Sequence, residues 1–264
     1  MADYLVTGAS SGIGRALARE LVRRGHRVWG AARREELLAG LQQELGGDGF
    51  RFSVCDVGRI EDVRRAKSAM DRAGFFPEVI ILNAGVNPEA GGTPFSLATF
   101  EAVTRVNLLG AMVWVEAFLS TYRARGRGQF AAISSLAAYR GDARWVAYCA
   151  SKSALSRAFE ALRARHRRHG VTFTTIHLGA ADTGMGSGSR SPFCLTEERA
   201  VRRILAAIER RASSVTIPRS LRLIVELMRI LPDAVFSRLV AEVSRVPDGE
   251  LESRLPSAAE EKSE

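Results

Sequence analysis

The chain of 264 residues is 46% hydrophobic and 25% charged, which is enough to bury one substantial core, and no linker or shift in composition divides it. Its formal charge of +9 would suit nucleic acid, but aromatic residues make up only 7% and no DNA- or RNA-binding motif is present, so no nucleic-acid partner is expected. The three cysteines, without a CxxC pair or a histidine cluster, support neither a disulfide framework nor a metal site.

Short apolar runs alternate with helix-length amphipathic segments, a pattern that predicts a parallel sheet with helices on both faces. Expected strands are 4–6, 27–30, 50–54, 79–82, 129–133, 171–178 and 214–217. Expected helices are 12–24, 35–45, 60–72, 97–125, 145–169 and 196–211. Gly25 and Gly170 stand just past the last periodic residue of their helices, where C-terminal capping glycines belong. The expected fold class is therefore α/β, a doubly wound sheet of seven strands.

The first expected strand runs into Thr7-Gly8-Ala9-Ser10-Ser11-Gly12-Ile13-Gly14 and then directly into a helix. Glycines allow a tight turn and a close approach of the backbone to a diphosphate, which the free N–H groups and the positive dipole end of the helix can bind. The alternative is that these glycines only close a turn. Strand, turn and helix nevertheless follow in the order that a dinucleotide site requires, so a dinucleotide is the favoured ligand.

Later motifs make a family resemblance specific. Asn83-Ala84-Gly85 follows the fourth strand, Asn107 lies in the long helix, and Ser135 ends an apolar run thirteen residues before Tyr148, which is followed four residues later by Lys152. With the glycine turn, Gly179 and Thr183, these motifs resemble the single-domain branch of the short-chain dehydrogenase/reductase family over about residues 3–218. The resemblance implies a Rossmann-like sheet of order 3-2-1-4-5-6-7, a nicotinamide cofactor, and a catalytic group of Asn107, Ser135, Tyr148 and Lys152. The cofactor contacts that it implies are Gly8, Ser10, Ser11, Gly12, Ile13, Gly14, Asp56, Val57, Asn83, Ala84, Gly85, Tyr148, Lys152 and Thr183.

The end of the second expected strand decides between the two nicotinamide cofactors, because the adenosine ribose lies there. An acidic side chain would accept from a 2′-hydroxyl and repel a 2′-phosphate, but the chain has Ala32 and then Arg33. NADP(H) is therefore expected, with Arg33 on the phosphate and Arg34 and Arg15 as candidate helpers. Two alternatives stay open: Arg33 as an ordinary exposed cation, and Asp56 as a local cap rather than the family's adenine contact.

Tyr148 is the expected general acid and base. A phenol has an unperturbed pKa of about 10, and a proton donor works best with a pKa nearer the operating pH. Lys152, one helical turn further on the same face, is expected to lower that pKa, and the resemblance adds a bond from its ammonium to the nicotinamide ribose. Ser135 is expected to donate to the substrate carbonyl oxygen, with Ser134 as its rival. By resemblance Asn107 fixes a water for proton resupply; the alternative is local bonding within its helix.

Apolar residues flank the expected catalytic group and favour a lipophilic ketone or secondary alcohol as substrate. They are Leu136, Tyr139, Trp145, Met185, Phe193 and Leu195. The glycine-rich loop 184–189 is expected to act as a mobile lid, with plain disorder as the alternative. Leu178 stands where the family often has proline, which would leave the loop around Thr183 less rigid.

Residues 219–256 are expected to form a helical extension of a catalytic domain at 1–218, and residues 257–264 a disordered acidic tail. Apolar residues alternate with arginines over 221–243, a pattern that suits a lid, a subunit interface or an anionic membrane surface. Packing within the protein or a dimer is favoured, and a homodimer or homotetramer is expected. No leader pattern precedes Tyr4 and no uncharged stretch approaches the ~20 residues that span a membrane, so a cytoplasmic location is expected, with membrane association as the alternative.

Two other functions stay open at this point. One is an NADPH-binding sensor or scaffold without turnover, against which the four filled catalytic positions argue. The other is an NAD-dependent alcohol dehydrogenase, against which Ala32 and Arg33 argue.

Overall fold

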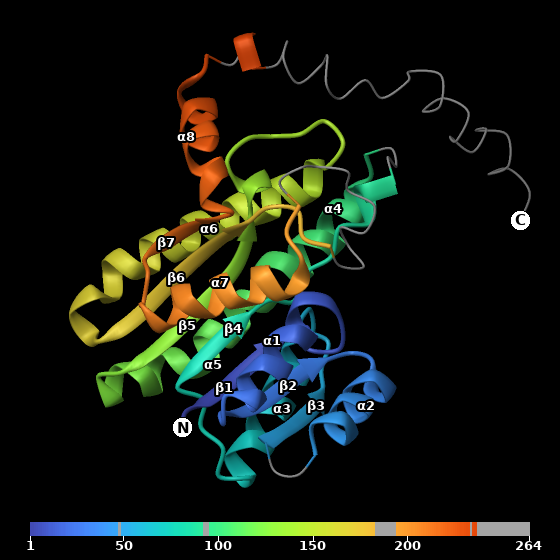
Figure 1. Ribbon diagram of the computed structural model, residues 1–264, viewed down its shortest axis with the longest axis vertical. Helices are drawn as coiled ribbons and strands as arrows, with labels where there is room; N and C mark the ends of the chain where they lie inside the picture. The colour runs from blue at the N-terminus through green and yellow to red at the C-terminus, as the bar shows by residue number, and fades with distance from the viewer. Residues whose placement is uncertain (47–48, 92–94, 183–193, 233, 237–264) are drawn as a thin grey trace, which may run out of the picture.

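A parallel sheet of seven strands in the order β3-β2-β1-β4-β5-β6-β7 forms the centre of the molecule (Figure 1). This computed structural model describes residues 1–46, 49–91, 95–182, 194–232 and 234–236. The strands are β1 (Asp3–Thr7), β2 (Arg27–Ala32), β3 (Phe50–Val54), β4 (Val79–Leu82), β5 (Gly128–Ser135), β6 (Val171–Leu178) and β7 (Ser214–Ile217). The predicted strands and the strand order are confirmed.

The helices between the strands follow the predicted ranges closely. They are α1 (Gly12–Arg23), α2 (Glu35–Leu45), α3 (Ile60–Arg72), α4 (Leu97–Thr104), α5 (Gly110–Arg125), α6 (Val146–His166) and α7 (Glu197–Glu209). The predicted helix 97–125 is continuous, but a π-helical turn at Arg105–Leu109 separates α4 from α5. Gly25 and Gly170 have positive φ angles of 80° and 68°, as expected of glycines that follow helix ends.

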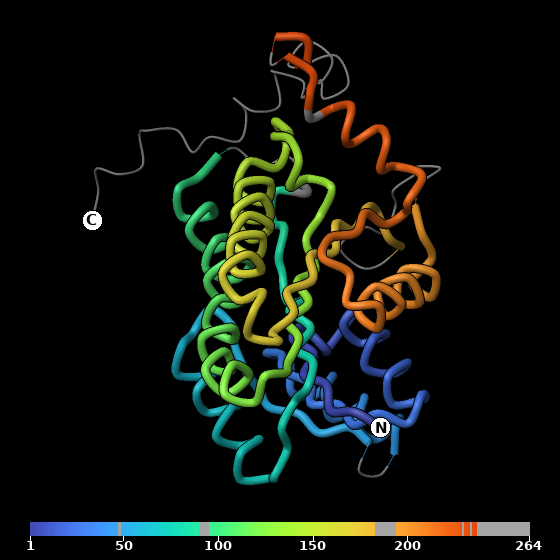
Figure 2. Tube along the Cα trace, turned by 90° about the vertical axis from the view of Figure 1, so that its left-hand side faces the viewer, coloured from blue at the N-terminus to red at the C-terminus, as the bar shows by residue number. Residues whose placement is uncertain are grey.

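Two apolar cores, one on each face of the sheet, hold the helices in two layers (Figure 2). Side chains alternate between the faces along each strand, so Val6 of β1 joins one core and its neighbour Leu5 joins the other. The first core packs against α1, α2 and α7, and the second against α3, α5 and α6. Trp114, Phe118 and Tyr122 fill the second core from α5. Burial on both faces explains why a central strand such as β4, with the sequence Val-Ile-Ile-Leu, is wholly apolar.

The order of the strands reverses beside β1, which pairs with β2 on one side and with β4 on the other. In such a sheet the connections diverge to opposite faces and leave a crevice at the carboxyl ends of the strands. The glycine turn follows β1 at this edge, the Asn83 turn follows β4, and Ser135 ends β5. The topology alone therefore brings these three segments to one end of the molecule.

The C-terminal extension begins with a 3-10 turn at Arg219–Leu221 and continues as α8 (Arg222–Ile230) (Figure 1). The Arg140 side chain, from the β5–α6 connection, donates hydrogen bonds to the carbonyl oxygens of Met228 (2.9 Å) and Leu231. Helix α8 ends two residues before Pro232, as expected from the constraint that proline places on preceding residues. Residues 237–264, which include the rest of the expected helix and the acidic tail, lie outside the described residues.

The helix that contains α4 and α5 is long and apolar. By length and composition alone, the continuous helix Leu97–Arg125 could cross a membrane, although the sequence contains no long uncharged stretch there. Its buried side chains Ala111, Trp114 and Phe118 pack in the second core, on one face of the sheet. The core helix of a globular domain fits this pattern of burial, and membrane contact is not shown.

Candidate active site

The turn between β1 and α1 can be made only by glycine at three positions. Gly8 and Gly12 have φ angles of +71° and +49°. A Cβ on Gly14 would lie 2.2 Å from the carbonyl oxygen of Gly8. Ser11, the N-cap residue of α1, makes no side-chain capping bond, so the helix start is left to bind another group. Close backbone packing and an uncapped helix start fit the diphosphate of a dinucleotide.

Thr7 joins this turn to the one that follows β4. Its hydroxyl oxygen accepts hydrogen bonds from the backbone N–H groups of Asn83 and Ala84, each at 3.0 Å. The Asn83 amide in turn donates to the Thr7 carbonyl at 3.0 Å. A Cβ on Gly85 would lie 3.3 Å from both the Asn107 side-chain oxygen and the Lys152 ammonium, so the second turn closely approaches these two predicted catalytic residues. No pattern in the sequence indicated this role for Thr7.

The three candidate arginines occupy different positions. Arg33 is exposed to solvent just beyond β2. The Arg34 guanidinium donates to the hydroxyls of Ser11 (2.6 Å) and Ser10 (3.1 Å), directly on the glycine turn. Arg15 forms an ion pair with Glu44 at 3.0 Å. The structure therefore brings Arg34 to the expected cofactor crevice more directly than Arg33 or Arg15.

Asp56 and Val57 follow β3. The Asp56 carboxylate accepts from the N–H of Gly58 at 2.9 Å, while its own N–H donates to Asp62 at 3.0 Å. Val57 is buried against Gly110, where a Cβ would come within 2.8 Å of the Val57 carbonyl oxygen. Asp56 therefore caps its own turn, one of the two roles that the sequence left open.

Ser135 and Tyr148 interact through their side chains. A hydrogen bond from Ser135 favours the ionised phenol, but burial has the larger effect and raises the pKa of Tyr148 above its usual value. Ser134 is directed elsewhere: its hydroxyl donates to the Lys152 carbonyl at 3.2 Å and lies 2.8 Å from the hydroxyl of Ser156. Geometry thus selects Ser135 over Ser134 as the partner of the phenol.

Lys152 is almost fully buried, with 4% of its surface exposed. Its ammonium lies 5.7 Å from the centre of the Tyr148 ring and donates to the Ile133 carbonyl at 2.9 Å. Burial lowers the pKa of Lys152 to about 8. The net pKa of Tyr148 is raised rather than lowered, because burial of the phenol is the largest influence on it, and the expected lowering by Lys152 stays a prediction.

Asn107 lies in the π-helical turn between α4 and α5 and is 1% exposed. Its side-chain oxygen accepts from the N–H of Val86 at 2.8 Å, and its amide donates to the Val86 carbonyl at 3.0 Å and the Ser151 hydroxyl at 3.1 Å. The residue therefore does not bond within its own helix, which was the alternative. It connects the turn after β4 to the helix that carries Tyr148.

Glu89 is a site residue that the sequence analysis missed. It lies in a 3-10 turn at Pro88–Gly91, and its carboxylate accepts from the backbone N–H groups of Ala147 and Tyr148, each at 3.1 Å. The contact joins segments more than fifty residues apart, and no local pattern in the sequence signals it.

The residues expected around the substrate divide into three groups. Leu136, Tyr139 and Trp145 are partly buried and lie near the predicted catalytic residues in the sequence. Leu195 is 8% exposed and belongs to the core under α7. Thr183, the loop 184–189, Met185 and Phe193 lie outside the described residues. Gly179 donates to the Ile217 carbonyl at 2.7 Å, which fixes the chain just beyond Leu178 although the family proline is missing.

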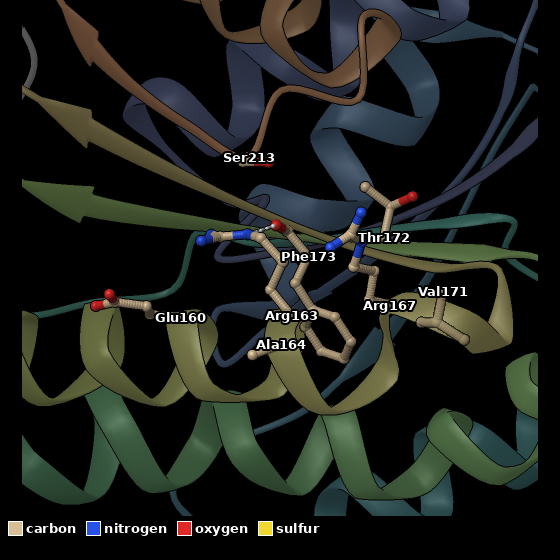
Figure 3. A pocket seen from close by; sticks show the side chains of 8 residues that line it. All are labelled: Glu160, Arg163, Ala164, Arg167, Val171, Thr172, Phe173 and Ser213. Carbon is tan, nitrogen blue, oxygen red and sulfur yellow. Dashed lines mark hydrogen bonds between the residues drawn. The ribbon is translucent and has the colours of Figure 1, made fainter.

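A separate cavity of about 390 Å³ lies beside the C-terminal half of α6 and the start of β6 (Figure 3). Arg163 lines it and donates to the Phe173 carbonyl at 2.8 Å and to the Thr175 hydroxyl at 3.0 Å. None of the predicted catalytic or cofactor residues lines this cavity. It is therefore distinct from the crevice at the carboxyl ends of the strands.

Comparison with known proteins agrees with this geometry. A protein-family model described as short chain dehydrogenase matches residues 3–192. The chain belongs to the short-chain dehydrogenase family. It is an oxidoreductase of that family, whose members bind a nicotinamide cofactor and act on small molecules, commonly as oligomers.

Individual relatives of this short-chain dehydrogenase cover most of its length. An uncharacterized oxidoreductase of Myxococcus xanthus (strain DK1622) is 32% identical over 241 residues, which are 88% of this chain and 93% of that protein. The NADPH-dependent pterin aldehyde reductase of Arabidopsis thaliana is 32% identical over 182 residues, 68% of this chain and 74% of that protein. A short chain dehydrogenase from Burkholderia cenocepacia J2315, solved in complex with NADP, superimposes with a TM-score of 0.77 at 27% identity and covers 90% of this chain and 97% of that one.

Proposed function

We propose that the protein is an NADP(H)-dependent reductase that transfers hydride between nicotinamide and a lipophilic ketone or secondary alcohol, with Tyr148 as general acid and base. The observation that carries this proposal is the Ser135–Tyr148 contact with the Lys152 ammonium 5.7 Å from the phenol ring. A hydroxyl donor, a proton donor and a buried cation together suit the reduction of a carbonyl group.

Each of these side chains has a separate task. Ser135 holds the carbonyl oxygen of the substrate, and Tyr148 donates its phenolic proton to that oxygen as the carbonyl carbon is reduced. The bound nicotinamide supplies the hydride. Lys152 stabilises the phenolate that remains, and Asn107 holds the turn after β4 against the catalytic helix. The raised pKa of Tyr148 keeps the phenol protonated at neutral pH, so the side chain has a proton to donate in the direction of reduction.

The residues available to hold the cofactor fit a nicotinamide dinucleotide. Gly8, Gly12 and Gly14 leave room for the diphosphate at the start of α1. Arg33 and Arg34 would bind a 2′-phosphate, where a cofactor without that phosphate is usually met by an acidic side chain. The NADP bound in the Burkholderia dehydrogenase and the NADPH dependence of the Arabidopsis reductase support the same choice. Thr183 is proposed as a contact of the nicotinamide amide.

The proposed substrate is lipophilic because the crevice is flanked by apolar and aromatic side chains. Leu136, Tyr139 and Trp145 lie beside Ser135 and Tyr148 in sequence and in the fold. The Arabidopsis relative is named for an aldehyde, so the class of carbonyl compound needs a panel rather than a single test compound.

The proposed assembly is a cytoplasmic homodimer or homotetramer in which residues 219–256 pack on the protein or on a second subunit. The bonds from Arg140 to the end of α8 support packing against the catalytic domain. Membrane contact is the alternative for this extension. Flotation with anionic vesicles tests it, because equal flotation of a chain truncated at Arg219 would remove the membrane alternative.

The decisive experiment measures NADPH consumption with a panel of apolar ketones, comparing the wild-type protein with Tyr148→Phe. The proposal expects turnover of at least one ketone by the wild type and loss of that turnover in the variant, because the phenylalanine ring has no proton to donate. NADPH binding by both proteins without any turnover would instead indicate a sensor or scaffold. Equal turnover by the two proteins would overturn the role of Tyr148.

A further inference from the structure

The helix that carries Tyr148 and Lys152 begins without a cap of its own. Its N-cap residue, Trp145, has no side-chain oxygen and makes no side-chain capping bond. The first turn of a helix contains backbone N–H groups that have no acceptor within the helix, and leaving them without partners costs stability. Tyr148 is the third residue of α6, so its own N–H belongs to this group.

Glu89 supplies the missing acceptors from a distant segment. One carboxylate oxygen accepts from the Ala147 N–H and the other from the Tyr148 N–H, both at 3.1 Å. The residue is only 4% exposed, although carboxylates are seldom buried without a specific partner. A carboxylate at the positive end of a helix dipole is stabilised there, and its bonds to backbone N–H groups are stronger than those of a neutral acceptor.

The same loop is fixed to the active site at a second point. Val86, three residues before Glu89, is bonded through its N–H and its carbonyl to Asn107. Asn107 also bonds to Ser151 in α6. The loop therefore holds the catalytic helix on both sides of Tyr148, directly through Glu89 and indirectly through Asn107.

We propose that Glu89 is a positioning residue that sets the place of Tyr148 for proton transfer. The inference rests on the proposed role of Tyr148 as the proton donor. A backbone displacement at residue 148 moves the phenol relative to Ser135, and misplacement of a reacting group by about 1 Å can cost on the order of a hundredfold in rate. A cap that served stability alone would leave the rate of the folded enzyme unchanged, so the two roles are separable.

A matched control exists at the start of α7. The Thr196 hydroxyl accepts from the Arg199 N–H at 3.4 Å and caps a helix that carries none of the proposed catalytic residues. Glu89→Ala and Thr196→Ala are each expected to lower the melting temperature by roughly 2–4 °C, the usual effect of a lost cap in a protein of this size.

The two variants are expected to differ in kcat. Glu89→Ala should lower kcat for a ketone substrate by about 10- to 100-fold with KM unchanged, because the proton donor is displaced while the binding surface is retained. Glu89→Gln keeps one acceptor oxygen and should recover part of the loss. Thr196→Ala should keep the wild-type kcat. Glu89→Ala with wild-type kcat, or an equal loss in Thr196→Ala, would overturn the proposal.

Amide hydrogen exchange gives a measurement that does not depend on turnover. The amides of Ala147 and Tyr148 should exchange faster in Glu89→Ala than in the wild type, and at the wild-type rate in Thr196→Ala. Unchanged exchange in Glu89→Ala would overturn the proposal even if activity fell. A wild-type protein that reduces no ketone would instead count against the proposed function. The exchange data would still test the contact of Glu89 with the helix, so failure of the proposed function and failure of the proposed role of Glu89 can be told apart.

Discussion

Burial acts in opposite directions on the two titratable groups of the catalytic helix. It raises the pKa of the Tyr148 phenol and lowers the pKa of the Lys152 ammonium to about 8. Both groups are consequently protonated at neutral pH, as a proton donor and its supporting cation should be during ketone reduction. Burial of the ammonium also has a cost in stability, which can be measured.

Lys152→Met is expected to stabilise the protein at neutral pH. The pKa of Lys152 is about 8 in the folded protein against 10.5 for an unperturbed lysine, so the cost of burying the charge is fully present below pH 8 and is lost as the pH rises from 8 to 10.5. Removing the charge should therefore raise the free energy of unfolding by about 1–3 kcal/mol at neutral pH, and by much less near the upper end of that range.

Urea unfolding of both proteins across this pH range measures the effect. Lys67→Met, at a partly exposed lysine paired with Asp71, is the control and should show no comparable gain. A difference between wild type and Lys152→Met that does not change with pH would contradict the assignment. The variant should also lose ketone reduction.

The arginines after β2 give a test of cofactor choice. Arg33→Ala and Arg34→Ala should each weaken NADPH binding by roughly tenfold, about 1.4 kcal/mol, and leave NADH binding unchanged, because only NADPH carries the 2′-phosphate. Fluorescence titration with each cofactor measures the ratio, and Arg64→Ala, on the exposed face of α3, serves as the control. A protein that binds both cofactors equally well before and after substitution would point to NAD instead.

At the level of single residues, the sequence was a good guide to which side chains lie together and a poorer guide to how they affect one another. The spacing from Ser135 to Tyr148 selected the serine that the structure also selects. The sequence could not foresee that burial would dominate the pKa of Tyr148, because burial depends on packing from several segments. Glu89 was missed for a related reason, since its partners belong to a helix far along the chain.

Among the helices and strands, apolar periodicity predicted most boundaries because each amphipathic face packs on one side of a two-layered sheet. The π-helical turn at Arg105–Leu109 was not predicted, since one widened turn leaves the periodicity of a long helix almost unchanged. That turn contains Asn107, so the irregular part of the helix coincides with a proposed catalytic residue. Irregular helical turns of this kind are frequently found at functional sites.

Substituting alanine for glycine should lower the stability of the protein in α1 and raise it in α2. In Gly14→Ala the new Cβ would lie 2.2 Å from a backbone oxygen, and we expect a loss of about 2–3 kcal/mol in the free energy of unfolding together with loss of dinucleotide binding. Gly40 lies within α2, and beyond its chain neighbours and the backbone of its own helix a Cβ there would meet no described atom within 4 Å, so Gly40→Ala should stabilise the protein by about 0.5–1 kcal/mol. Urea denaturation of both variants measures the difference, and a stabilising Gly14→Ala would contradict the tight turn.

For the whole molecule, the two-layered sheet and its strand order place the glycine turn, Asn83 and Ser135 at one edge, and sequence motifs were sufficient to predict this arrangement. The attachment of the C-terminal extension was not predictable in the same way. Arg140 gave no signal in the sequence, yet it joins the connection between Ser135 and Tyr148 to the end of α8. Its guanidinium also lies 4.8 Å from the centre of the Phe236 ring.

Arg140→Ala should therefore detach the extension while leaving the sheet intact. The loss of two hydrogen bonds to carbonyls at a helix end should cost at least about 1.4 kcal/mol locally, which corresponds to a tenfold increase in the open population and in the rate of tryptic cleavage within 219–230. Limited proteolysis followed by mass spectrometry measures that rate. Arg144→Ala, in the same connection, is the control, because Arg144 contacts Asp142 and the Trp145 ring. Both variants lose one arginine from the same loop, but only Arg140→Ala loses the link to α8. Equal cleavage of the two variants would therefore mean that the extension is held by contacts other than those of Arg140.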